Sequence, residues 1–121
     1  MTFYATKLKN LQTSLYKNQG QINAIISVKN YIDTNYETDL NMDLLSKIQL
    51  VSKYHLIRLF KKYYGLTPRK YLINKRIEKS KEYLVAGMTV TKTCYAVGFT
   101  SLGSFSTLVK TKTGETPGQF R

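Results

Sequence analysis

Residues 52–68, SKYHLIRLFKKYYGLTP, decide the fold, because residues 101–117, SLGSFSTLVKTKTGETP, repeat their pattern 49 positions later. Each segment opens with a serine that can cap a helix N-terminus. Each then carries an apolar helical face, a glycine that ends the helix, and a Thr-Pro pair that begins another. Agreement of cap, apolar face, stop and restart in one register predicts two copies of a helix-turn-helix unit.

Hydrophobic spacing around the repeat predicts a chain made almost entirely of helices. The expected helices lie at about 22–35, 42–49, 53–64, 68–85 and 90–96, with a last one capped at residue 100 or 101 and ending near residue 111. Residues 1–18 also have helical spacing, at Tyr4, Leu8, Leu11 and Leu15. We expect Gln19-Gly20-Gln21 to separate that segment from the next helix.

The same spacing predicts which side chains face inward. The expected inner faces hold Ile22, Ile25, Ile26, Tyr31 and Ile32 in the first of these helices, Met42, Leu45 and Ile48 in the second, and Leu56, Leu59, Phe60 and Tyr63 in the third.

The predicted fold class is all-α, with two helix-turn-helix (homeodomain-like) subdomains joined by a long linker helix. The expected boundaries are 1–21 for an N-terminal stub or linker helix, 22–67 for the first subdomain, 68–86 for the linker helix and 87–121 for the second subdomain. At 1.5 Å per residue the linker helix would be about 27 Å long. That length is compatible with two helices in successive major grooves, which lie about 34 Å apart.

The charge of the chain favours a polyanionic partner. Lys and Arg total 19 against 7 Asp and Glu, a formal net charge of +12. Residues 47–92 concentrate twelve of the basic residues and only two acidic ones. A surface of this kind suits nucleic acid. A basic surface without a partner is the plain alternative.

The outward face of the first recognition helix, residues 53–64, has side chains suited to DNA. Arg58 can make a bidentate contact to guanine, and Tyr54 and Ile57 can contact thymine methyl groups. Phosphates are the expected partners of Lys53, Lys61 and Lys62.

The second recognition helix is chemically different. Its outward positions are Leu102, Gly103, Ser104, Thr107 and Lys110. Because none of them is Arg, Gln or Asn, we expect weaker base readout and more contact with the backbone. The function predicted from these faces is sequence-specific double-stranded DNA binding in the major groove by a transcription regulator. The alternative is a basic module that binds nucleic acid without sequence specificity.

Enzyme activity is not expected. The single histidine and the single cysteine, His55 and Cys94, lie about 40 positions apart on different predicted helices. No Cys/His cluster has metal spacing, so the prediction contains no catalytic residue, no metal site and no cofactor. Cys94 is expected to be a buried thiol, and His55 a surface residue or a phosphate neighbour. No transmembrane run or signal peptide is recognised, which favours a cytoplasmic, nucleoid-associated location.

Motifs along residues 22–121 carry a family resemblance. The first half contains the run from Ser52 to Lys61, then Gly65-Leu66-Thr67-Pro68, Tyr71-Leu72 and Arg76-Ile77. The second half contains Val97-Gly98-Phe99, Phe105-Ser106, Lys110, Gly114-Glu115-Thr116-Pro117 and Phe120-Arg121. Together these resemble the signature of the AraC/XylS family, and the string in the second half is the more specific part.

The resemblance implies a transcription factor, often an activator, with two helix-turn-helix subdomains on a long helix. It places Tyr54, Ile57 and Arg58 where family members touch bases, and Leu102, Gly103, Ser104 and Thr107 at the base-facing positions of the second helix. RNA polymerase is then a candidate partner besides double-stranded DNA. An effector or dimerisation domain, if the protein has one, is expected outside this chain.

Several residues depart from the family pattern. Small-residue positions are changed at Ser46 and Ser80, and Leu50 stands where glycine is common. Further departures are Thr93, Gly103, Thr107 and Val109. Gly103 and Thr107 in particular weaken the expected base readout by the second half.

Overall fold

The computed structural model describes the backbone of residues 2–121 and the side chains of residues 6, 7 and 19–121. Its elements are α1 (Thr2–Thr34), α2 (Met42–Gln49), α3 (Lys53–Tyr64), α4 (Pro68–Val85), α5 (Val90–Ala96), α6 (Leu102–Thr113) and the 3₁₀ turn η1 (Pro117–Phe120). All regular structure in this part of the chain is helical, which confirms the all-α prediction.

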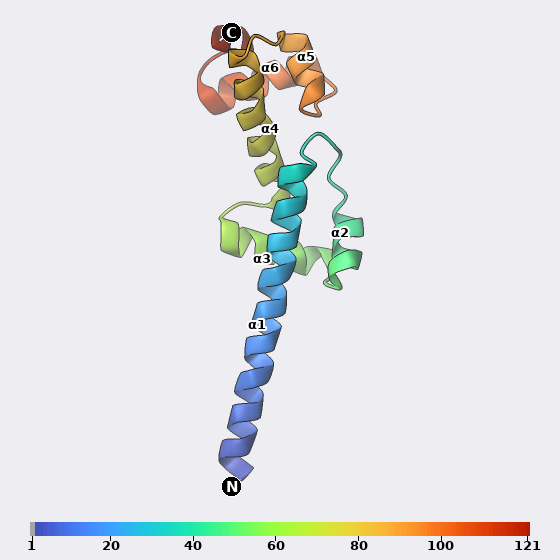
Figure 1. Ribbon diagram of the computed structural model, residues 1–121, viewed down its shortest axis with the longest axis vertical. Coiled ribbons are helices and arrows are strands. Elements are labelled where there is room, and N and C mark those ends of the chain that lie inside the picture. The colour runs from blue at the N-terminus through green and yellow to red at the C-terminus, as the bar shows by residue number, and fades with distance from the viewer. Residues whose placement is uncertain (1) are drawn as a thin grey trace.

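The first helix differs from its prediction. α1 is a single helix from Thr2 to Thr34, and Gln19-Gly20-Gln21 does not interrupt it. Gly20 keeps a negative φ, and one glycine costs a helix only about 1 kcal/mol relative to alanine. The N-terminal part of α1 extends away from the rest of the molecule (Figure 1). The side chains of Tyr4, Leu8, Leu11 and Leu15, whose spacing suggested a separate helix, lie outside those described.

The first half has its own hydrophobic core. α1 packs against α3 and α4, and α2 packs against α3. The buried side chains are Ala24, Ile25, Val28, Ile32, Leu45, Leu56, Leu59, Phe60 and Leu72. Tyr64 and Tyr71 pack beside Phe60, with ring centroids 4.7 Å and 5.6 Å from it.

Three predicted inner-face residues are exposed instead. Ile26, Ile48 and Tyr63 keep 44%, 62% and 47% of their surface accessible. The prediction for Ile26 is wrong because α1 contacts its neighbours through Ile25, Val28 and Ile32. The error at Ile48 arises because α2 is covered on the narrow face that meets α3. Tyr63 turns outward because Tyr64, one residue later, joins the aromatic cluster.

The second half is built around a smaller core of Ile77, Cys94, Phe105 and Val109. α5 and α6 pack against each other, and α4 is held by α5 and η1. The bounds of α5 match the prediction, and α6 runs two residues further than expected, to Thr113. Cys94 is fully buried, as predicted, and its burial raises the pKa of its thiol.

Helix ends in both halves follow the repeat. Ser52 and Thr67 accept hydrogen bonds from the backbone N–H groups of residues three positions later, and Ser101 does the same at the start of α6. Gly65 and Gly114 end α3 and α6 with φ of 81° and 83°. This conformation favours glycine.

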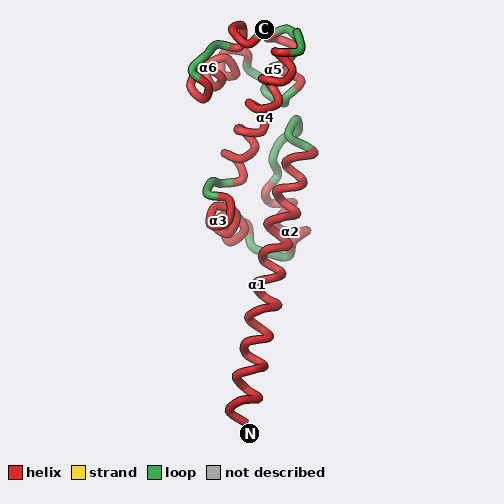
Figure 2. The backbone as a smooth tube through the Cα atoms, turned by 60° about the vertical axis from the view of Figure 1, so that its left-hand side comes forward, coloured by secondary structure: helices red, strands yellow, loops and turns green. Residues whose placement is uncertain are grey.

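The long helix α4 separates the two halves. α3 lies at one end of α4 and α6 at the other (Figure 1). Figure 2 shows α3 and α6 on one side of the molecule, with α2 and α5 on the other. Within the described residues, no helix is long and apolar enough to cross a membrane.

Candidate nucleic-acid interface

The way in which α3 is anchored determines which of its faces is exposed. Leu56, Leu59 and Phe60 are buried against the first core, so the opposite side of the helix is turned to solvent. Tyr54 is 73% exposed there. The remaining predicted residues on that face are exposed at Arg58, Lys61 and Lys62 and half-buried at Lys53 and Ile57.

Lys53 is less free than the sequence suggested. Its Nζ lies 3.1 Å from the Asp43 carboxylate of α2 and 5.4 Å from the centroid of the Tyr54 ring. The hydrogen bond with Asp43 raises the pKa of Lys53. In this structure Lys53 ties the two helices of the first helix-turn-helix unit together, so a phosphate would have to compete with Asp43 for its ammonium group.

His55 lies on the other flank of α3. It is half-buried, and its Nε2 is 3.4 Å from Nε2 of Gln21 in α1. The ring thus contacts α1 rather than standing free on the exposed face. It gives the face no metal ligand set, since no group of three or more His, Cys, Asp or Glu side chains converges in the described part of the chain.

α6 presents the second face. Phe105 and Val109 are buried in the second core, which leaves Leu102, Gly103, Ser104, Thr107 and Lys110 exposed, as predicted. A Cβ built on Gly103 would meet no atom within 4 Å. The glycine is therefore not required by packing, and it leaves the exposed face of α6 without a side chain at this position.

α3 and α6 each carry positive charge at both of their ends. The last turn of α3 carries Lys61 and Lys62, and the last turn of α6 carries Lys110 and Lys112. Neither helix has an acidic residue in its first turn, so the positive end of each helix dipole is uncompensated by its own side chains. The two helices thus have similar positive charge at their ends, whereas the exposed arginine and tyrosine, Arg58 and Tyr54, lie on α3.

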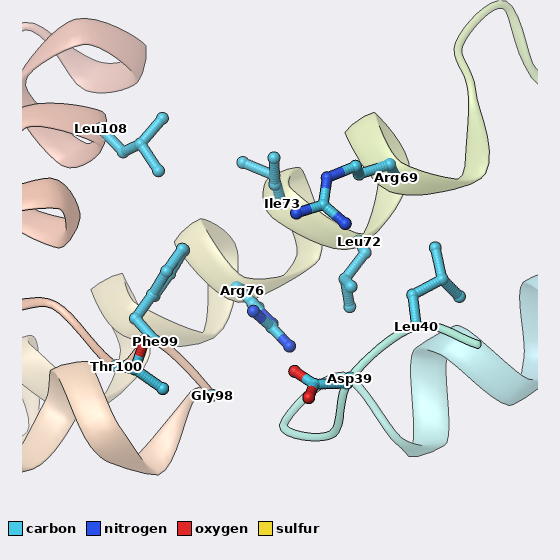
Figure 3. A pocket seen from close by; sticks show the side chains of 10 residues that line it. All are labelled: Asp39, Leu40, Arg69, Leu72, Ile73, Arg76, Gly98, Phe99, Thr100 and Leu108. Atoms are coloured by element: carbon cyan, nitrogen blue, oxygen red, sulfur yellow. The ribbon is translucent and has the colours of Figure 1, made fainter. Parts of the chain in front are cut away.

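Between the halves lies a cavity of about 280 Å³ that the sequence did not reveal (Figure 3). Its apolar lining comes from Leu40, Leu72, Ile73, Phe99 and Leu108. Arg69 and Arg76 of α4 and Asp39 of the α1–α2 loop supply the charged groups. The sequence distinguishes Arg76 only as part of the Arg76-Ile77 motif, because its hydrogen-bond partners lie about 40 positions away in the chain.

Comparison with known proteins agrees with this geometry. A family model described as "Helix-turn-helix domain" matches residues 45–121. The bifunctional transcriptional activator/DNA repair enzyme AdaA of Bacillus subtilis (strain 168) is 36% identical over 95 residues, which cover 78% of this chain and 45% of that protein. The chain spans about half the length of the curated relatives it matches.

Two solved structures share the fold. The C-terminal domain of the two-component response regulator yesN from Fusobacterium nucleatum superposes with a TM-score of 0.74 at 31% identity, covering 82% of this chain and 98% of that one. An AraC-type DNA-binding domain protein from Chromobacterium violaceum gives a TM-score of 0.72 at 27% identity, covering 88% and 93%. The chain therefore belongs to the AraC/XylS-type helix-turn-helix family of DNA-binding transcription regulators.

Proposed function

We propose that this chain is the part of a transcription regulator that binds double-stranded DNA sequence-specifically, with α3 and α6 in two major-groove segments. The observation that carries the proposal is the repeated build of these helices at the two ends of α4. Each has a serine cap, a buried inner face and an exposed outer face. Activation is the favoured direction, because relatives of this chain include proteins named as transcriptional activators.

In this proposal the two helices have unequal roles. Tyr54, Ile57 and Arg58 read base edges, and Lys61 and Lys62 hold phosphates. On α6, Leu102, Ser104 and Thr107 make apolar or single hydrogen-bond contacts, while Lys110 and the helix N-terminus hold the backbone. Gly103 allows close approach without adding a contact of its own, and Lys53 reaches a phosphate only by leaving Asp43.

The proposed division of labour follows the chain. Residues 22–67 form the reading subdomain, 68–86 the linker helix and 87–121 the second subdomain, with 1–21 as an N-terminal extension. The role assigned to the chain is binding rather than catalysis, and DNA in the cytoplasmic nucleoid is its proposed target. RNA polymerase and an effector or dimerisation domain outside this chain are further proposed partners.

A specific regulator must be distinguished from a basic module that binds any nucleic acid. The outward face formed by exposed Tyr54 and Arg58 and half-buried Ile57 favours the specific regulator, since a protein that only holds phosphates needs no such face. Phosphate contacts alone would give equal affinity for every duplex at a given salt concentration.

The experiment is a selection of duplexes from a random pool by the full chain, followed by competition at fixed salt. A selected duplex should compete at least about 10³-fold better than a scrambled duplex of equal length. Equal competition by the two duplexes would overturn the proposal and leave the nonspecific module as the function.

A further inference from the structure

The two halves of the protein meet through few residues. Helices α1, α2 and α3 pack among themselves and on α4, whereas α5, α6 and η1 pack among themselves and on the other part of α4. Their cores are separate, and the cavity of about 280 Å³ lies between them. The angle between the halves therefore depends on α4 and on whatever contacts bridge it.

Arg76, in the middle of α4, makes the main bridge on the first-half side. Its Nε donates a hydrogen bond of 2.6 Å to the carbonyl oxygen of Tyr36, and its Nη2 donates one of 2.8 Å to that of Thr38. Both carbonyls belong to the loop between α1 and α2. Arg76 is only 8% exposed. No ion pair joins it to a carboxylate in the described part of the chain, so carbonyl oxygens carry its hydrogen bonding.

The same guanidinium also contacts the second half. Its Cζ lies 5.3 Å from the centroid of the Phe99 ring, and Phe99 stacks on Phe105 of the second core at 5.4 Å. A bidentate, planar group of this kind holds its neighbours in a defined orientation better than a single ammonium does. Arg76 thus contacts the loop of one half and the turn of the other.

Gly98 brings the two halves still closer. It precedes Phe99 in the α5–α6 turn and has φ of 103°. A Cβ at this position would lie 2.6 Å from the carbonyl oxygen of Glu37 and 2.9 Å from Cζ of Arg76. The backbone of the second half is therefore seated directly against the first-half loop, in a space that only glycine fits.

A second contact, besides those of Arg76, joins the α1–α2 loop to α4. The hydroxyl groups of Tyr36 and Tyr83 lie 2.8 Å apart, which joins the same loop to the C-terminal part of α4. The first-half loop is thus attached along α4 at two levels, with Gly98 against it between Tyr36 and Thr38. None of these contacts is made by a residue of either recognition helix.

We propose that Arg76 and Gly98 form an interdomain lock that sets the orientation of α6 relative to α3, and so decides whether the second helix engages DNA together with the first. Arg76 is a positioning residue in this proposal, because it acts through the loop and the turn without touching DNA. The DNA part of the inference rests on the proposed function, whereas the orientation part does not.

The orientation is tested without DNA. Spin labels are attached to Lys61→Cys on α3 and Lys112→Cys on α6, both exposed, in a Cys94→Ala background. The distance distribution between them should be narrow, and Arg76→Met should broaden it at least twofold. Val109→Ala, which removes buried volume from the second core, is the matched control and should leave it narrow. Arg76→Lys, which keeps the charge and loses the fork, should broaden it to a smaller extent. It replaces Arg76→Met if that variant does not fold.

The consequence for DNA is tested on a duplex selected by the wild-type chain. Hydroxyl-radical footprinting should show two protected segments about one helical turn apart. In Arg76→Met the segment under α3 should persist, the segment under α6 should fade, and affinity should fall about tenfold. Lys110→Ala should weaken wild-type binding several-fold but change Arg76→Met binding less than 1.5-fold, because α6 no longer contributes.

Results of two kinds would overturn the lock. One is an equally narrow distance distribution in wild type and Arg76→Met, or a broad one already in wild type. The other is an unchanged second footprint with additive effects of Arg76→Met and Lys110→Ala. If no duplex is preferred in the selection, the proposed function fails while the spin-label result still decides the orientation.

Discussion

The hydroxyl of Tyr71 donates a hydrogen bond of 2.7 Å to the carboxylate of Asp33, which ties α4 to α1. Lys29 lies 2.9 Å from the same carboxylate and Lys75 3.8 Å from it. Burial by itself would raise the pKa of Asp33, but the hydrogen bonds from Lys29 and Tyr71 and the charges of Lys29 and Lys75 together lower it. The first half is therefore held together by an ionised aspartate at the helix–helix contact.

The lowered pKa of Asp33 predicts a pH dependence of stability. A carboxyl whose pKa is lower in the folded state stabilises the fold above its unfolded value of about 3.9. That contribution is lost as the pH falls from about 4 through the folded value. Asp33→Asn should lower the free energy of unfolding by about 1 kcal/mol at pH 7, since the pairs are partly exposed.

Urea unfolding at pH 7 and at pH 3 checks this prediction. Wild type should lose more stability between the two pH values than Asp33→Asn does. Glu115→Gln, an exposed acidic residue of the second half, is the control and should behave like wild type. Parallel losses in wild type and Asp33→Asn would show that Asp33 contributes nothing through its charge.

Leu50 offers a stabilising substitution. It ends α2 with φ of 56°, the only positive φ at a non-glycine residue within the described chain, and its side chain is 91% exposed. Left-handed backbone costs a residue with a side chain about 1–2 kcal/mol, part of which glycine loses again in chain entropy. Leu50→Gly should therefore raise the free energy of unfolding by about 0.5–1 kcal/mol.

Gly65 is the matched opposite case. It ends α3 with φ of 81°, and a Cβ there would meet no atom within 4 Å. Gly65→Ala should therefore destabilise the protein by about 1 kcal/mol through backbone conformation alone. Thermal and urea unfolding of both variants measure the direction in which each substitution changes the free energy of unfolding. A Leu50→Gly protein less stable than wild type would mean that the Leu50 side chain makes a stabilising contact.

Arg58 should matter more than Thr107 for base preference. Arg58→Ala should cost about 1–3 kcal/mol in binding and relax specificity at one base pair, because it removes the bidentate contact to guanine that the proposed function assigns to this residue. Thr107→Ala removes at most one hydrogen bond and one apolar contact, so its effect should be smaller. Binding to a panel of single-base variants of the selected duplex measures both. The reverse order would contradict the assignment of base reading to α3.

Lys62 should act on affinity without acting on sequence preference. Each phosphate contact contributes about 0.9 to the slope of log K against log salt, so Lys62→Ala should reduce that slope by about 1. Lys7→Ala removes the same charge from an exposed lysine in the N-terminal part of α1, a part of the helix that lies far from α3 and α6 (Figure 1), and should leave the slope unchanged. Equal slopes in wild type and Lys62→Ala would remove Lys62 from the interface.

Local signals predicted the helices well where caps and stops are encoded by neighbouring residues. α4 begins at the Thr67-Pro68 pair, as predicted. α5 occupies the predicted residues 90–96, and the residues on either side of that range mark its ends. The predicted break at Gly20 is wrong, since a single glycine without proline does not end a helix. The exposed faces of α3 and α6 were also predictable, because they are the complement of buried faces with regular spacing.

By itself, the sequence determined the repeat, the helix ends and the outward residues of α3 and α6, because caps, glycine stops and apolar periodicity act within a few residues. Only the tertiary structure decided that Ile48 and Tyr63 are exposed, since burial depends on which neighbouring helix covers a face. It alone placed Arg76 on the carbonyl oxygens of Tyr36 and Thr38, and Gly98 against Glu37. These contacts join distant segments, so the angle between the halves depends on packing that no local pattern encodes.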